Sequence, residues 1–140
     1  LDHATGQGLC VIDLDTVMPG LALYDFGDMA RTATRSSVED ERDLSKVLFK
    51  EEMFEALVRG YLESAGRFLN RAEIDLLAFS APLITFEIGI RFLADYLAGD
   101  TYFKTHREGQ NLDRCRVQFK MVREMESRRE TLEAGVRRYS

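Results

Sequence analysis

The fold class is decided by the sequence RAEIDLLAFSAPLITFEIGIRFLADYLAG, residues 71–99. Apolar side chains fall on almost every side of a helix built from it, which predicts a long, central and deeply buried helix that ends just before Gly99. Asn70 is a good N-cap, and Glu73 stands three residues later, where it completes a capping box. Pro82 is expected to break or kink this helix.

Helical patterns also surround this stretch. A shorter helix is expected from about Asp25 to Thr34, because aspartate favours helix starts, and a last helix is expected from Asn111 onward. The polar stretch 36–43 predicts a surface loop. A further amphipathic helix is predicted by an apolar stripe that consists of Phe54, Leu57, Val58, Tyr61, Leu62 and Ala65. The sequence therefore predicts a mainly α domain of about four helices.

The first residues differ from the rest because they favour a strand. Leu9–Leu14 is a short apolar, β-branched run that follows the turn residues Thr5–Gly8. This pattern predicts a buried strand that leaves a hairpin turn, and Leu1 and Asp2 would end an earlier strand. A lone hairpin is only marginally stable in water. We therefore expect a short N-terminal β-hairpin that is the remnant of a larger β-unit.

Composition indicates one soluble globular domain. The chain has 140 residues, of which 45% are hydrophobic and 31% charged, and its net charge is -5. This acidic balance argues against nucleic-acid binding, and the absence of a long uncharged apolar run argues against a membrane span. Cys10 and Cys115 lie far apart in apolar patterns and predict two reduced core thiols. With no signal segment at its start, the chain is expected in the cytoplasm.

Carboxylates gather near the N-terminus. Residues 1–30 contain no Lys or Arg and five aspartates, namely Asp2, Asp13, Asp15, Asp25 and Asp28. Asp13 would lie at the end of a buried strand, where an ionised carboxylate needs a partner. A divalent cation is one candidate, and oxygen ligands favour magnesium. An arginine such as Arg31 or Arg91 is the other candidate, and the residues alone leave both open.

Two families contain an apolar strand that ends in this way. Asp13, Asp15 and Val17 fit the Asp-x-Asp-x-Thr/Val pattern of the haloacid-dehalogenase phosphatases, in which the first aspartate is a nucleophile. That resemblance implies several more parallel strands, whereas the pattern after residue 50 is helical. A phosphatase that uses Asp13 is one alternative function, and a non-catalytic helical interaction module is another.

The second resemblance covers nearly the whole chain. The motifs IDLD at residues 12–15 and DFG at residues 25–27 together resemble the segment after the catalytic loop in the aminoglycoside phosphotransferase and choline kinase-like superfamily. Residues 87–104 and 111–120 resemble the C-terminal part of bacterial N-acetylhexosamine 1-kinases. The resemblance implies the C-terminal portion of a protein kinase-like C-lobe. It also implies transfer of the ATP γ-phosphate to the anomeric hydroxyl of a small sugar.

The same resemblance implies a role for each matching residue. Asp13 matches the aspartate that holds Mg²⁺ against the ATP phosphates. Asp25 matches the helix-opening aspartate that braces the catalytic loop. Asp15, Arg91 and Tyr102 match substrate-side positions, where arginine would offer a rigid fork of donors to sugar oxygens.

Two of these residues also have ordinary structural explanations. Arg91 has Glu87 and Asp95 one helical turn away and would form an ion pair with either. Tyr102 would pack in the core. The sequence alone leaves these alternatives open.

Parts of a complete kinase are missing from these 140 residues. The sequence has no Gly-rich nucleotide loop and no His-x-Asp motif, so the resemblance implies a single-domain C-lobe fragment without N-lobe, catalytic loop or catalytic residue. We expect this fragment to be inactive alone. We also expect the open edge of the strand Leu9–Leu14 to pair with a second copy. ATP, Mg²⁺ and a small sugar are the ligands implied for the complete enzyme, with neither nucleic acid nor membrane as a partner.

Overall fold

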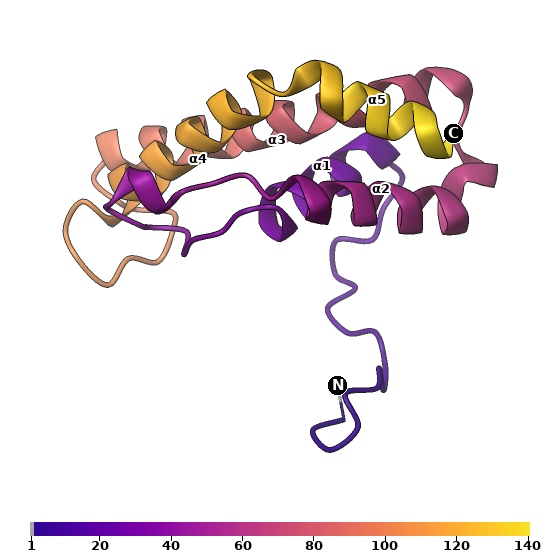
Figure 1. Ribbon diagram of the computed structural model, residues 1–140. Coiled ribbons are helices and arrows are strands. Elements are labelled where there is room, and N and C mark those ends of the chain that lie inside the picture. Colours follow the sequence, from indigo (N-terminus) through magenta and orange to yellow (C-terminus); the bar gives the residue numbers. More distant parts are fainter. Residues whose placement is uncertain (1) are drawn as a thin grey trace.

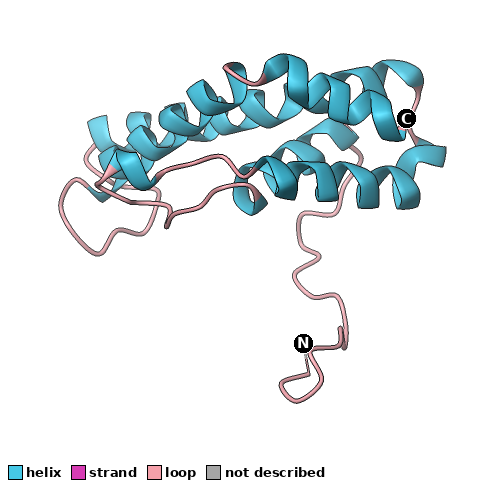
Figure 2. Cartoon of the chain, in the orientation of Figure 1, coloured by secondary structure: helices cyan, strands magenta, loops and turns pink. Residues whose placement is uncertain are grey.

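The computed structural model describes residues 2–140 and is built from helices (Figure 2). The five α-helices are α1 (Ala22–Ala33), α2 (Glu51–Ala65), α3 (Arg71–Leu97), α4 (Gln110–Glu126) and α5 (Arg129–Tyr139). Short 3₁₀ turns, η1 (Leu44–Lys46) and η2 (Gly66–Phe68), stand between them. The mainly α class predicted from the sequence is confirmed.

Helix α3 is the centre of the arrangement. Helices α1, α4 and α5 pack against it, and α2 packs against α5 and α1. Figure 1 shows α4 and α5 following one another along α3, with α1 and α2 on the other side of the bundle. The buried side chains therefore come from every helix, and the largest include Phe26, Phe54, Leu77, Met121 and Leu132. Phe26 and Phe54 meet edge to face with ring centroids 6.0 Å apart, an arrangement that aromatic quadrupoles favour.

The ends of α3 follow the sequence signals. The side chain of Asn70 accepts a hydrogen bond from the Glu73 N–H at 3.0 Å, and Glu73 accepts one from the Asn70 N–H at 2.8 Å, so the capping box is confirmed. Gly99 follows the C-cap with a φ of 90°, a conformation that glycine adopts without strain. Pro82 lies inside the helix and does not break it.

The expected burial of α3 is only partly met. One face packs in the core through residues such as Leu77, Ala81 and Ile84. Another face exposes apolar side chains, among them Phe79, Leu83 and Phe86. Helix α3 is long and apolar enough to cross a membrane by length and composition alone, although 44% of its apolar window is buried inside the fold.

The expected N-terminal hairpin is absent from the described residues. A turn forms, in which the Asp2 N–H donates to the Gln7 carbonyl at 2.8 Å, but no strand occurs within residues 2–140. Leu9, Val11 and Ile12 are 69–80% exposed, and Figure 1 shows this indigo segment leading away from the helices. The physical reason is that two short paired strands are only marginally stable in water when no third strand or helix packs against them. Leu1, assigned to an earlier strand, lies outside the described residues.

Several boundaries and burials also differ from the sequence prediction. Helix α1 begins at Ala22, three residues before Asp25. The expected last helix is two helices, because the chain turns at Ser127 between α4 and α5. Cys115 is buried, where desolvation raises the pKa of its thiol, whereas Cys10 is exposed because the buried strand expected to contain it does not form.

Candidate functional site

The loop that follows α3 is held by one buried carboxylate. Asp95 is 6% exposed and accepts hydrogen bonds from the backbone N–H groups of Thr101 at 2.9 Å, Tyr102 at 2.8 Å and Phe103 at 2.9 Å. The Asn111 side-chain amide donates to the same carboxylate at 2.9 Å. The loop therefore has a fixed path that does not depend on secondary structure.

The donors around Asp95 also set its ionisation. Burial by itself would raise the pKa of Asp95, but the backbone N–H donors of Phe103, Tyr102 and Thr101 outweigh it, so the pKa lies below its ordinary value. The carboxylate therefore stays ionised at neutral pH and keeps all of its acceptor sites for the loop. From the sequence, Asp95 was expected only as an ion-pair candidate for Arg91.

Arg91 and Tyr102 are brought together by this loop. Nη2 of Arg91 lies 3.5 Å from the phenolic oxygen of Tyr102. The guanidinium carbon lies 5.7 Å from the ring centroid of Tyr102 and 5.6 Å from that of Phe103, within the range of cation–π attraction. Two residues eleven positions apart in sequence thus form one surface feature.

Both ordinary explanations for these residues differ from what the structure shows. Within residues 2–140 Arg91 forms no ion pair, and the carboxylate of Asp95 is bound by the loop instead. Tyr102 is 73% exposed, so it is not a core side chain. The pair offers several N–H donors, one O–H group and one exposed aromatic ring to solvent. Such a set suits a ligand rich in hydroxyl oxygens.

A second polar network fastens the other end of the same loop. Arg107 donates to Asp113 at 2.6 Å and to Asp40 at 3.1 Å, and Gln110 donates to Asp40 at 3.0 Å. Asp113 is buried, and desolvation alone would raise its pKa, but Arg107 lowers it below the ordinary value. No sequence signal links Asp40 to Arg107, since 67 positions separate them. The network ties the loop after α1 to the start of α4.

Asp13 and Asp15 lie apart from this loop. Both are exposed in the N-terminal segment, and Asp13 has a φ of 62°. Figure 1 shows that segment and the loop after α3 in different parts of the molecule. Arg31, one of the partners considered for Asp13, instead pairs with Asp28 at 2.8 Å and with Glu39 at 3.3 Å. The premise that Asp13 is buried is therefore not met in this structure.

Asp25 lies in the first turn of α1 and is exposed. Burial raises the pKa of Tyr61, and the nearby charge of Asp25 raises it further. The Tyr61 hydroxyl donates a hydrogen bond to the Ala22 carbonyl at 3.4 Å. Gly27, two residues further along, faces α3 closely: a Cβ built on it would lie 2.7 Å from the Ser80 carbonyl oxygen. The DFG motif thus places its glycine in the core and its aspartate in solvent.

The residues available for a metal ion are few. Within residues 2–140 no three His, Cys, Asp or Glu side chains form a group that would hold a metal ion. Magnesium in nucleotide sites commonly takes one or two carboxylates and completes its shell with phosphates and water. Asp13 and Asp15, exposed and two residues apart, fit that smaller requirement. No protein-family model matches the chain.

Proposed function

We propose that this chain is the C-terminal part of an ATP- and Mg²⁺-dependent phosphotransferase that phosphorylates a small sugar, most specifically the anomeric hydroxyl of an N-acetylhexosamine. The observation that carries the proposal is the approach of Tyr102, on the anchored loop, to Arg91 of α3, at 3.5 Å. The resemblance to N-acetylhexosamine kinases had placed these two residues in one sugar pocket. Their exposure and their freedom from carboxylate partners support the same role.

In this proposal the loop after α3 binds the sugar. The guanidinium of Arg91 donates to sugar oxygens, and its stacking on Tyr102 and Phe103 limits the orientations it adopts. The phenol of Tyr102 either donates to or accepts from a hydroxyl group. Asp95 acts through the loop as a positioning residue, because its carboxylate fixes the backbone of Tyr102. Asp15 contributes an acceptor from the substrate side.

The nucleotide side of the proposal depends on Asp13 and Asp25. Asp13 would hold Mg²⁺, which offsets the charge on the ATP phosphates when bound. Asp25 opens α1 with its carboxylate in solvent, available to accept backbone N–H groups of a catalytic loop. The proposal gives this chain no catalytic base, so the 140 residues alone are expected to be inactive. The complete enzyme is proposed to work in the cytoplasm.

The experiment is a comparison of this chain with the longer gene product that the proposal requires. We expect the longer protein to phosphorylate N-acetylglucosamine or N-acetylgalactosamine with ATP and Mg²⁺, and the 140-residue chain to give none. Steady turnover by the 140-residue chain, or none by the longer protein, would count against the proposal.

One variant separates a metal-binding role of Asp13 from a structural one. Because Asp13 is exposed in this structure, Asp13→Asn should leave the melting temperature of the 140-residue chain unchanged. In the longer protein the same change should nearly abolish turnover and weaken its Mg²⁺ dependence. Near-normal turnover together with a lower melting temperature would assign Asp13 a structural role instead.

The two alternatives fare differently. A haloacid-dehalogenase-type phosphatase needs a parallel sheet behind its nucleophile, and residues 2–140 contain no strand, so we do not propose it. A helical interaction module is favoured by one specific observation, the exposed apolar face of α3. That face does not conflict with a phosphotransferase and is developed next.

A further inference from the structure

An apolar stripe runs the length of α3 and is open to solvent. It is defined by the residues Leu76, Phe79, Leu83, Phe86, Ile90, Leu93 and Leu97, and is called the α3 stripe below. Six of the seven are exposed, from 43% at Leu83 to 76% at Leu97. Leu93 is partly buried. The charged residues of α3, such as Asp75, Glu87 and Arg91, all stand off this line.

The spacing of the α3 stripe indicates the shape of what covers it. Its members alternate by three and four positions, which is a heptad a/d pattern sustained over three heptads. A period of 3.5 residues keeps a seam facing another helix that runs alongside, whereas packing on an irregular surface has no such requirement. The expected partner is therefore an apolar helix about 40 Å long, the length of α3 itself.

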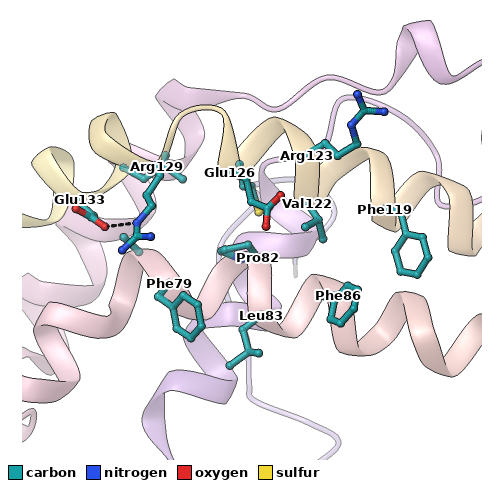
Figure 3. A pocket seen from close by; sticks show the side chains of 13 residues that line it. Phe79, Pro82, Leu83, Phe86, Phe119, Val122, Arg123, Glu126, Arg129 and Glu133 are labelled. Atoms are coloured by element: carbon teal, nitrogen blue, oxygen red, sulfur yellow. Dashed lines mark hydrogen bonds and ion pairs between the residues drawn. The ribbon is translucent and has the colours of Figure 1, made fainter.

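Beside the α3 stripe lies a groove that deepens this surface. It has a volume of about 460 Å³ and is walled by α3, α4 and α5. Figure 3 shows Phe86 of α3 beside Phe119 of α4, and the groove is also lined by Phe79 and Leu83 of α3 and by Val122 of α4. Phe86 stacks on Phe119 with ring centroids 5.6 Å apart. Large side chains of a facing helix could pack into this groove in a knobs-into-holes manner.

We propose that the α3 stripe is the interface of a homodimer, in which the α3 helices of two copies pack antiparallel about a two-fold axis near Leu83 and Phe86. A second copy presents an identical helix of the required length, period and apolarity. A two-fold interface needs only this self-complementarity. In this register Leu83 faces Phe86 of the second copy, and Phe79 faces its Ile90.

The α3 stripe supplies most of the area that a dimer interface needs. Half-exposed leucine and phenylalanine side chains each leave about 100 Å² accessible, so six of them expose on the order of 600 Å². This is at the upper end for the largest apolar patch of a monomer, about 300–600 Å². A stable interface buries about 800 Å² per partner, so the α3 stripe alone supplies most, but not all, of what such an interface needs.

Charge is compatible with the same partner. The groove is bordered by Arg123, Glu126, Arg129 and Glu133, two of each sign, and Arg129 pairs with Glu133 at 2.8 Å (Figure 3). A border of mixed sign does not repel its own copy, as a border of one sign would. This dimer replaces the earlier expectation of pairing at residues 9–14, where no strand is formed. It does not depend on the proposed enzymatic function.

The test measures the mass of the purified 140-residue chain by light scattering and sedimentation over a wide range of concentrations. We expect twice the 16.0 kDa chain mass. Leu83→Glu and, separately, Ile90→Glu should raise the dimer dissociation constant at least about tenfold, because each puts a charge into the seam. Phe68→Glu is the matched control, since Phe68 is 74% exposed but lies outside the α3 stripe.

Each outcome decides the proposal. Circular dichroism verifies that each variant keeps its helices, and the two stripe variants guard against misfolding of either one. A chain that is monomeric at every concentration would overturn the dimer. The proposal would also be overturned if Phe68→Glu weakened the dimer as much as the stripe variants do. The same holds if only Ile12→Glu, in the N-terminal segment, abolished the dimer. A monomeric wild-type chain that floats with phosphatidylcholine vesicles, and a Leu83→Glu variant that does not, would assign the α3 stripe to a membrane. That result would also overturn the proposal.

Discussion

The carboxylate of Asp95 accepts a hydrogen bond of 2.8 Å from the backbone N–H of Tyr102. This contact links the last turn of α3 to the loop that carries a proposed substrate residue. The same carboxylate also holds Thr101, Phe103 and Asn111, so one side chain fixes both the loop and the start of α4. A loop restrained in this way presents Tyr102 with little freedom of its backbone.

The first prediction concerns this anchor. Asp95→Asn keeps the size of the side chain but exchanges one acceptor oxygen for a donor, which leaves backbone N–H groups of the loop without partners. We expect the melting temperature to fall by roughly 5 °C or more. Faster hydrogen exchange should appear at Thr101, Tyr102 and Phe103. Asp75→Asn is the control, because Asp75 lies on the same helix but is exposed; an equal loss there would refute the anchor.

The second prediction concerns pH. The folded-state pKa values of Asp95 and Asp113 are both lowered, so these carboxylates bind protons less readily in the folded chain than in the unfolded chain. Their stabilisation is fully present above the unfolded value, about 3.9, and is lost as pH falls through the lower folded values. Melting temperatures should be level from neutral pH to about pH 5 and fall below about pH 4. In Asp113→Asn that acid-side fall should be shallower, and an unchanged profile would contradict the assignment.

Local signals in the sequence predicted the helices well. The capping box at Asn70 and the C-terminal Gly99 act within a few residues, so each is readable from the sequence and is confirmed in the structure. The N-terminal hairpin with its strand at residues 9–14 was wrong because strand formation needs partners from elsewhere in a fold. Of the break or kink expected at Pro82, the break does not occur, because the packing of α1, α4 and α5 along α3 outweighs one lost backbone hydrogen bond.

The candidate site was predictable only in part. Arg91 and Tyr102 were named from a resemblance, and helical periodicity does not show that a loop would return to put them 3.5 Å apart. Asp95 was missed as an anchor because backbone N–H groups, which every residue carries, are its partners. Asp40 and Arg107 were missed because their pairing spans 67 positions. Such contacts depend on the tertiary fold and leave no fixed spacing in the sequence.

The third prediction tests the close approach of α1 to α3. A Cβ on Gly27 would lie 2.5 Å from Cγ1 of Ile84 and 2.7 Å from the Ser80 carbonyl oxygen. Gly27→Ala should therefore push the helices apart and lower the free energy of unfolding by about 2–4 kcal/mol. Gly60→Ala is the control, because Gly60 lies in α2 with nothing within 4 Å of the added atom. It should stabilise by about 0.5–1 kcal/mol through helix propensity. Chemical denaturation measures both, and equal effects would disprove the close approach.

The fourth prediction concerns ligand binding at the loop after α3. Arg91→Gln removes the guanidinium, and Tyr102→Phe removes only the phenolic hydroxyl. Each should weaken N-acetylglucosamine binding to the longer protein by about tenfold, the value of one or two hydrogen bonds to a sugar. Because both side chains are exposed, melting temperatures of the 140-residue chain should not change. Unaltered affinity in both variants would remove this loop from the proposed sugar site.

The last prediction concerns two glutamines of α4 in opposite situations. Gln118 is fully buried, and neither its amide nitrogen nor its oxygen has a hydrogen-bond partner within the described residues. Gln110 is 8% exposed and fully used: its nitrogen donates to Asp40 at 3.0 Å, and its oxygen accepts from the His106 N–H at 2.7 Å. Methionine is similar to glutamine in length and has no strong polar atoms, so the same substitution separates the two cases.

Gln118→Met should raise the free energy of unfolding by about 1 kcal/mol, because an unsatisfied amide is removed from the core. Gln110→Met should lower it by about 1–3 kcal/mol, because the Asp40 carboxylate and the His106 N–H each lose a partner. The measurement is denaturant unfolding of both variants beside the wild-type chain, with the slope compared to verify two-state behaviour. A loss of stability in Gln118→Met equal to that in Gln110→Met would mean that the Gln118 amide is hydrogen-bonded in solution, and would contradict the unpartnered core amide.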